Sequence, residues 1–206
     1  MIEVWGRRNS INVQKVLWCC DELDLAYRLV EAGGAYGRTA EPDYRALNPT
    51  GLVPTLVDDG IVVWESNAIV RYLSRRYGAG TLWPDDAQAH ARAESWMDWQ
   101  TTAWLRLRPA FIGLIRTPEA ERDRASIEAA LETTAGHMQL LESHLSEHDY
   151  IAGHAFSMGD IPLGATVNRW LKLDIARPST PALTAWEQRL SQRPAYTDTV
   201  RSIPLS

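Results

Sequence analysis

Cysteine is scarce in this sequence, with only Cys19 and Cys20 among its 206 residues. Because the two are neighbours, they cannot link distant parts of the chain, and their spacing matches no metal or redox motif. This cysteine usage suits a reducing compartment. The sequence therefore predicts neither a disulfide framework nor a Cys-ligated metal.

Long apolar runs and clustered positive charge are also lacking. No stretch approaches the roughly 18 consecutive apolar residues of a membrane helix. Glu3, Arg7 and Arg8 stand where a signal peptide needs an uninterrupted apolar segment. The formal net charge of -5, with basic residues scattered rather than clustered, argues against a nucleic-acid partner. We therefore expect a cytoplasmic protein that binds neither nucleic acid nor membranes.

Apolar residues make up 45% of the chain, enough to bury a substantial core. In the first part, a short strand is expected at Ile2–Trp5 and a second at Tyr27–Val30. Between them, Val13, Val16, Leu17, Cys20 and Leu23 fall at helical spacing and predict one buried stripe.

Two further strands are expected at Val53–Val57 and Ile61–Trp64, because Asp59-Gly60 between them is a strong hairpin signal. A helix should then begin near Ser66. The predicted order is strand, helix, strand, short helix, strand, strand, helix.

The segment 79–86 is rich in Gly, Pro and Asp and predicts a linker between a domain at 1–78 and a second domain at 87–206. Every later pattern is helical. Long helices are expected from Ala87 to about Arg116, where Pro109 should introduce a kink, and from Ile127 to Leu145. Further helices should begin near Asp160 and Ala182.

Three segments together resemble the glutathione transferase family. They are N-P-T-G-L-V-P at Asn48–Pro54, E-S-N-A-I at Glu65–Ile69, and the capping box S-M-G-D at Ser157–Asp160. With the helical remainder, the resemblance covers nearly the whole chain. It implies a thioredoxin-like α/β amino-terminal domain that binds glutathione, followed by an all-α carboxy-terminal domain.

The first two segments carry the expected glutathione site. In the family the proline of the first segment is cis, and the residue before it pairs with the cysteinyl amide of glutathione, roles that we assign to Pro54 and Val53. Ser66 can open a helix whose free amides attract the glutamyl carboxylate, and Glu65 can meet the glutamyl ammonium. Seen alone, Ser66 is equally a simple helix cap.

The third segment has a structural interpretation. Ser157 and Asp160 have the spacing of a capping box before an apolar helix. We expect Asp160 to stabilise the start of that helix rather than to act as a catalytic acid.

The group that activates the glutathione thiol should lie between Arg8 and Val13, a stretch that contains no tyrosine. The string S-I-N-V-Q-K-V resembles serine-type theta members and bacterial members with a Thr-Pro-Asn-Gly pattern. Ser10 and Asn12 are therefore the candidate catalytic residues, since a hydroxyl or amide donor favours the thiolate. Ser10 is also a plausible helix cap. Cys19 and Cys20 lie too far along the helix for a cysteine-type mechanism.

One expected contact departs from the family pattern. Many relatives have Lys or Gln before the Val-Pro pair to hold the glycyl carboxylate, whereas this chain has Leu52. Arg38, in a polar loop, is the alternative candidate for that carboxylate.

The electrophile site is expected on the helix after the linker, where Trp104, Arg108 and Phe111 share a face. Equally, these aromatics fit a plain core. His144 and His148 are one helical turn apart, but no complementary ligands accompany them, so no metal is predicted. A homodimer is implied by the resemblance alone.

The leading prediction is a glutathione transferase, with glutathione as co-substrate, that attacks small apolar electrophiles in a detoxification role. Two alternatives stay open. One is glutathione-dependent reduction of disulfides or peroxides, and the other is a non-catalytic ligand-binding or interaction module.

Overall fold

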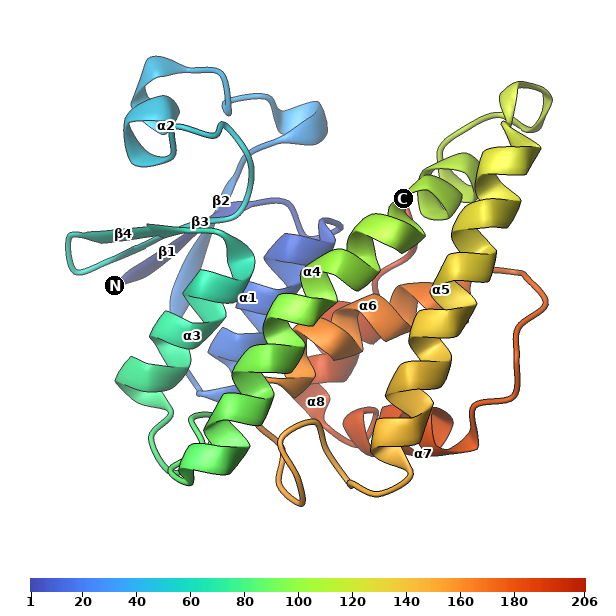
Figure 1. Cartoon of the computed structure of the whole chain (residues 1–206). Helices are drawn as coiled ribbons and strands as arrows, with labels where there is room; N and C mark the ends of the chain where they lie inside the picture. Colours follow the sequence, from blue (N-terminus) through green and yellow to red (C-terminus); the bar gives the residue numbers. More distant parts are fainter.

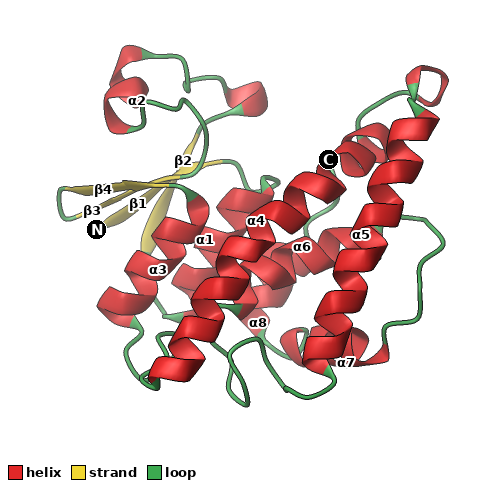
Figure 2. Ribbon diagram, in the orientation of Figure 1, coloured by secondary structure: helices red, strands yellow, loops and turns green.

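The first 77 residues form a four-stranded sheet with three α-helices, as seen in a computed structural model that describes residues 1–206 (Figures 1 and 2). The elements are β1 (Ile2–Gly6), α1 (Ile11–Glu22), β2 (Tyr27–Glu31), the 3-10 turn η1 (Gly34–Tyr36), α2 (Pro42–Leu47), β3 (Thr55–Asp58), β4 (Ile61–Trp64) and α3 (Ser66–Tyr77). The strand order is β2-β1-β3-β4. Strands β1 and β2 are parallel, and the other neighbours are antiparallel.

The predicted hairpin is confirmed, with a later start than the sequence suggested. Asp59 and Gly60 both adopt positive φ, 50° and 81°, as a two-residue hairpin turn requires. Strand β3 begins at Thr55 rather than Val53, because Pro54 has no N–H to donate to the sheet. The Val53–Pro54 peptide bond is cis.

Helix α1 differs from the prediction of a single buried stripe. Every residue from Val13 to Cys20 is buried, including the polar Gln14 and Lys15. The reason is that α1 packs against α3 on one side and against the helical part of the molecule on the other. Gly164 makes the second contact possible, since a Cβ there would lie 2.8 Å from the Trp18 ring.

The remainder of the chain is helical (Figure 2). Its elements are α4 (Ala87–Ile115), the 3-10 turn η2 (Glu119–Glu121), α5 (Arg124–Leu145), α6 (Asp160–Lys172), α7 (Pro181–Leu190), α8 (Pro194–Tyr196) and the π-helical turn η3 (Thr197–Arg201). The long helices α4 and α5 pack side by side, and α6 contacts α1, α4 and α7 (Figure 1). Helix α4 continues through Pro109. The predicted fold class, a mixed α/β part followed by an all-helical part, is confirmed.

Asp160 fixes the start of α6, as its place in the capping box predicts. One carboxylate oxygen accepts from the Ile151 amide and the Trp186 indole, at 3.0 and 2.9 Å. The other accepts from the Ser157 amide at 2.9 Å and from the Ser157 hydroxyl. Burial raises the pKa of Asp160 to about 6. Both carboxylate oxygens are therefore engaged in hydrogen bonds that hold the start of α6, as expected of a structural rather than a catalytic residue.

None of the helices combines the length and the apolar character needed to cross a membrane.

Candidate active site

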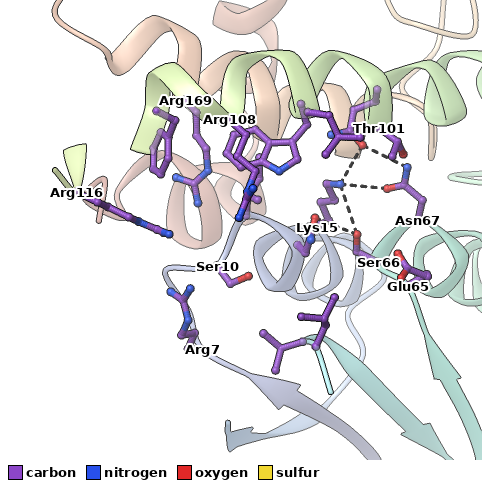
Figure 3. A pocket seen from close by; sticks show the side chains of 18 residues that line it. Arg7, Ser10, Lys15, Glu65, Ser66, Asn67, Thr101, Arg108, Arg116 and Arg169 are labelled. Atoms are coloured by element: carbon purple, nitrogen blue, oxygen red, sulfur yellow. Dashed lines mark hydrogen bonds between the residues drawn. The ribbon is translucent and has the colours of Figure 1, made fainter. Parts of the chain in front are cut away.

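A cavity of about 450 Å³ lies between the α/β part and the helices α4 and α6 (Figure 3). It brings together eight of the residues selected from the sequence, which are Ser10, Asn12, Val53, Glu65, Ser66, Trp104, Arg108 and Phe111. These residues come from segments up to about a hundred positions apart, so only the fold gathers them. The remaining two, Pro54 and Arg38, are not among the lining residues.

Ser10 stands at the start of α1 with its hydroxyl free of protein partners. Its backbone is extended, at φ -80° and ψ 124°, and its carbonyl accepts from the Gln14 amide. The side chain makes no capping bond. Ser10 therefore occupies the cap position without using its hydroxyl as a cap, and that hydroxyl can donate to a ligand at the positive end of α1.

Asn12 is engaged within the protein, because its side-chain oxygen accepts a hydrogen bond from the Ser66 hydroxyl at 3.3 Å. This contact joins the start of α1 to the start of α3. Asn12 thereby positions Ser66, which distinguishes its setting from that of Ser10.

Lys15 is a site residue that the sequence analysis missed. Although it is only 3% exposed, its ammonium donates to the side-chain oxygens of Gln100, Asn67 and Ser66, at 2.9, 3.2 and 3.4 Å. Burial lowers its pKa to about 7, an effect that Glu65 opposes. Lys15 lies one turn after Asn12 but outside the buried stripe that helical spacing predicts, so no signal in the sequence identified it.

The start of α3 presents an anion-binding end. Glu65, the residue before the helix, has φ 70° and ψ 116°, a backbone conformation that is costly for a residue with a side chain. It is exposed and forms no ion pair within 4.0 Å. The first amides of α3 have no partner further back in the helix, so they are available to an anion beside a free carboxylate.

The segment before Pro54 is held by a buried network. Asn48 donates to the Leu52 carbonyl and to the Thr55 hydroxyl, at 2.9 and 3.0 Å. Tyr44 reaches the same two oxygens at 2.6 and 2.9 Å. Val53, by contrast, has neither its amide nor its carbonyl in any backbone hydrogen bond. The network therefore leaves one open, strand-like residue on the cavity wall.

Arg38 lies away from this cavity. Its guanidinium stacks 4.9 Å from the centre of the Trp5 ring and forms a loose pair with Glu41 at 3.7 Å. Together with residues of β2 it lines a separate surface depression. The assignment of Arg38 to the glycyl carboxylate is not supported by any contact here.

The helical wall of the cavity is aromatic and basic. The rings of Trp104 and Phe111 lie 5.6 Å apart, centre to centre. Arg108 lines the cavity beside them. All three residues line the cavity, but Phe111 is only 2% exposed and also belongs to the buried core, as the alternative of plain core aromatics predicts for it.

Three further arginines line the same cavity and were missed from the sequence: Arg7, from the loop after β1, and Arg116 and Arg169, from the helical part. Arg169 is the only charged residue between Ile161 and Leu171, and this was the signal available in the sequence. Burial, together with the nearby Arg116 and Arg7, lowers the pKa of Arg169 to about 10.

Neither cysteine is suited to catalysis. Both are fully buried, and burial raises the pKa of Cys19 to about 12 and also raises that of Cys20. Neither therefore supplies a thiolate near neutral pH.

The two histidines of α5 are used locally. His144 and His148 stack 4.3 Å apart, and each ring contacts a backbone carbonyl. No group of three or more His, Cys, Asp or Glu side chains is arranged to hold a metal ion.

Comparison with known proteins identifies the family. Residues 1–75 match the family model described as "Glutathione S-transferase, N-terminal domain", and residues 101–194 match "Glutathione S-transferase, C-terminal domain". The chain is 40% identical to glutathione S-transferase GstB of Escherichia coli K12, over the full length of both. It is 32% identical to glutathione S-transferase 3 of Zea mays, covering 99% of this chain and 95% of that protein.

A solved structure agrees with this result. The theta class glutathione S-transferase of Xanthomonas axonopodis pv. citri, determined with glutathione bound, superposes with a TM-score of 0.95 at 47% identity. The match covers 100% of this chain and 99% of that one. The resemblance stated from three sequence segments is therefore confirmed. The chain belongs to the glutathione S-transferase family, and its activity is that of a glutathione-dependent transferase.

Proposed function

We propose that the cavity holds glutathione with its thiol against Ser10 and that the chain transfers this thiol to small electrophiles bound on Trp104 and Phe111. The observation that carries the proposal is the unused hydroxyl of Ser10. In Figure 3 it lies between the group formed by Lys15, Ser66 and Glu65 and the arginines on the other side.

Three groups of glutathione are held in this proposal. Its glutamyl carboxylate takes the free amides at the start of α3, while the glutamyl ammonium meets Glu65. The cysteinyl backbone pairs with the open amide and carbonyl of Val53. The thiol then points toward the start of α1.

Ser10 is the proposed activator. Its hydroxyl donates to the sulfur and so stabilises the thiolate over the thiol, which otherwise ionises near pH 8.5 like a free cysteine. The positive end of α1 and the surrounding arginines act in the same direction. Asn12, whose oxygen is held by Ser66, contributes by positioning that residue.

The transfer step needs no further protein nucleophile. The thiolate forms a carbon–sulfur bond to the electrophile, whose leaving group departs with the bonding electrons, or whose double bond takes up the pair. Exclusion of water by the aromatic wall strengthens the hydrogen bond to the sulfur. Conjugation of this kind supports the predicted detoxification role.

Steady-state kinetics with 1-chloro-2,4-dinitrobenzene and cumene hydroperoxide test the proposal. We expect conjugation of the aryl chloride, and a loss of about a hundredfold in kcat/KM in Ser10→Ala, as for removal of one preorganised donor. Asn12→Ala should lose about tenfold, mainly through KM for glutathione. Equal activity of Ser10→Ala and the unaltered protein would reject Ser10. Turnover of the hydroperoxide alone would favour the reductase alternative.

We also propose a homodimer and a cytoplasmic location. The support for the homodimer is a set of exposed apolar side chains on β4, α3 and α4: Ile61, Val62, Trp64, Tyr77 and Leu105. Light scattering at two protein concentrations checks the assembly, and a monomer at both would reject it. The two unpaired, buried cysteines suit a reducing compartment.

A further inference from the structure

Positive charge collects at the end of the cavity furthest from Glu65. Arg7, Arg108, Arg116 and Arg169 all line it, from the loop after β1 and from helices α4 and α6. Glu65 is the only acidic residue on the cavity wall, and Figure 3 shows it across Ser10 from Arg7, Arg116 and Arg169. No Asp or Glu side chain lies within ion-pair distance of any of the four arginines. Four like charges thus share one end of a cavity without an acidic side chain paired to them.

Arg169 is built into this position rather than solvated. It is 2% exposed, and one terminal nitrogen donates to the Asn9 carbonyl and to the Gln14 side chain, both at 3.1 Å. Both partners are neutral, and the buried Nε has no partner at all. Burying a cation with only neutral acceptors lowers the stability of the folded protein unless a ligand supplies the missing negative charge.

The other three arginines differ in the hydrogen bonds that they already form within the protein. Arg7 bonds the Asn9 side chain at 2.5 Å and leaves its buried Nε unpartnered. Arg116 donates to the backbone oxygen of Ser206 at 2.7 Å. Arg108 is exposed to the cavity and has no hydrogen-bond or ion-pair partner in the protein. Arg108 is therefore the most open of the four to an incoming anion, and Arg169 adds a buried guanidinium whose Nε is still unpartnered.

The aromatic side chains of Trp104 and Phe111 lie directly beside these cations. The Arg169 guanidinium is 5.0 Å from the centre of the Phe111 ring and 5.9 Å from that of Trp104. Arg116 is 5.4 Å from the Phe111 ring. Phe111 is only 2% exposed, whereas Trp104 is only partly buried. A flat apolar body resting on Trp104 would therefore carry a charged substituent into reach of the guanidinium groups.

We propose that the preferred electrophiles are organic anions, in which an aromatic or apolar body bears a carboxylate that Arg108 and Arg169 bind. This inference rests on the proposed placement of the glutathione thiol at Ser10, and it narrows the substrate class of that site. Since glutathione's glutamyl group is assigned to the Glu65 end, the arginine end is left to the second substrate.

The matched substrates 4-chloro-3-nitrobenzoate and methyl 4-chloro-3-nitrobenzoate test this. In both, the thiolate forms a carbon–sulfur bond at the ring carbon that carries chlorine, the carbon–chlorine bond breaks, and chloride leaves with the bonding pair. The thiol proton goes to solvent. The two differ in charge, so each kcat/KM is divided by the uncatalysed rate with glutathione. We expect a preference of about tenfold or more for the carboxylate, falling as salt is added.

Two variants that remove the same charge from the same helix sharpen the test. Arg108→Gln should reduce the carboxylate preference about tenfold. Arg106→Gln, two positions away and outside the cavity lining, should leave it unchanged. Equal preferences in these two variants, or no preference in the unaltered protein, would overturn the inference.

Two further measurements distinguish failure of this inference from failure of the proposed function. If Arg108→Gln raises KM for glutathione but not for glutathione monoethyl ester, the arginines bind the glycyl carboxylate and the inference is wrong. If the methyl ester is turned over and the carboxylate is not preferred, this inference is wrong, but the proposed function still holds. If neither compound is turned over, the proposed function fails, and calorimetry of 3-nitrobenzoate against nitrobenzene still decides whether the arginine end selects an anion.

Discussion

The two walls of the cavity are built in different ways. On the α/β wall, much of the expected binding is done by backbone groups at the ends of elements, namely the open amide and carbonyl of Val53 and the first amides of α3. On the helical wall, the expected contacts come from side chains of α4 and of the last turn of α6, such as Trp104, Arg108 and Arg169.

The difference explains what each wall can recognise. Backbone groups fixed by turns and helix starts suit a constant ligand such as glutathione. Side chains on long helices can be exchanged without disturbing a turn, so they suit a variable second substrate. Here that wall carries arginines without an acidic partner, which are the basis of the proposed preference for anionic electrophiles.

The largest expected effect is a loss of stability when Asp160, which holds the start of α6 on the helical wall, is changed. Asp160→Asn should lower the free energy of unfolding by about 3 kcal/mol, because an amide cannot accept from all the donors that surround the carboxylate. Urea unfolding checks this. Asp174→Asn, at an exposed position without contacts, is the matched control. A loss of the same size in both variants would contradict the anchoring role.

A smaller effect is expected on the α/β wall. Glu65→Gln keeps the shape of the side chain and removes the charge that we assign to the glutamyl ammonium. The dissociation constant of glutathione should rise about tenfold to a hundredfold, measured by calorimetry. Glu41→Gln, an exposed change outside the cavity, serves as control. An unchanged dissociation constant in Glu65→Gln would remove Glu65 from the glutathione site.

Lys15, where the two walls meet, should give the protein a pH-dependent stability. Burial holds its folded pKa at about 7, below its ordinary value of 10.5. Between these values the unfolded chain binds more protons, so stability rises with pH, by at most about 1.4 kcal/mol per unit. Lys15→Met should lack this rise between pH 7 and 9. Parallel stability profiles of the two proteins would contradict the lowered pKa.

The smallest effect is expected for Arg38→Ala, since Arg38 covers Trp5 and lies outside the cavity. KM for glutathione should change less than about twofold, the level expected of a solvated side chain. A larger rise that disappears with glutathione monoethyl ester would restore the sequence-based assignment of Arg38 to the glycyl carboxylate.

The sequence predicted site residues in short motifs better than charged residues that helix packing brings to the cavity, for a physical reason. Val53, Glu65 and Ser66 belong to short motifs whose backbone geometry is local, so their letters identify their positions. Lys15 and Arg169 are charged residues inside buried helices, and only the packing of α1 against α3 and α6 decides what they face. Helical periodicity alone does not contain that information.

The helices and strands show the same division between features that are set locally and features that depend on distant packing. The hairpin at Asp59-Gly60 and the start of α6 at Asp160 were predictable from local chemistry. The nearly complete burial of α1 was not, because it depends on helices far along the chain.

The most direct test of the account is the titration of glutathione bound to the protein, followed by thiolate absorbance in an ultraviolet difference spectrum. The account predicts that the bound thiol ionises well below its free value and that Ser10→Ala moves it back by about one to two pH units. Asn12→Ala should leave most of the shift in place. A bound thiol that ionises at its free value, or an identical titration in Ser10→Ala, would contradict the claim that Ser10 activates glutathione.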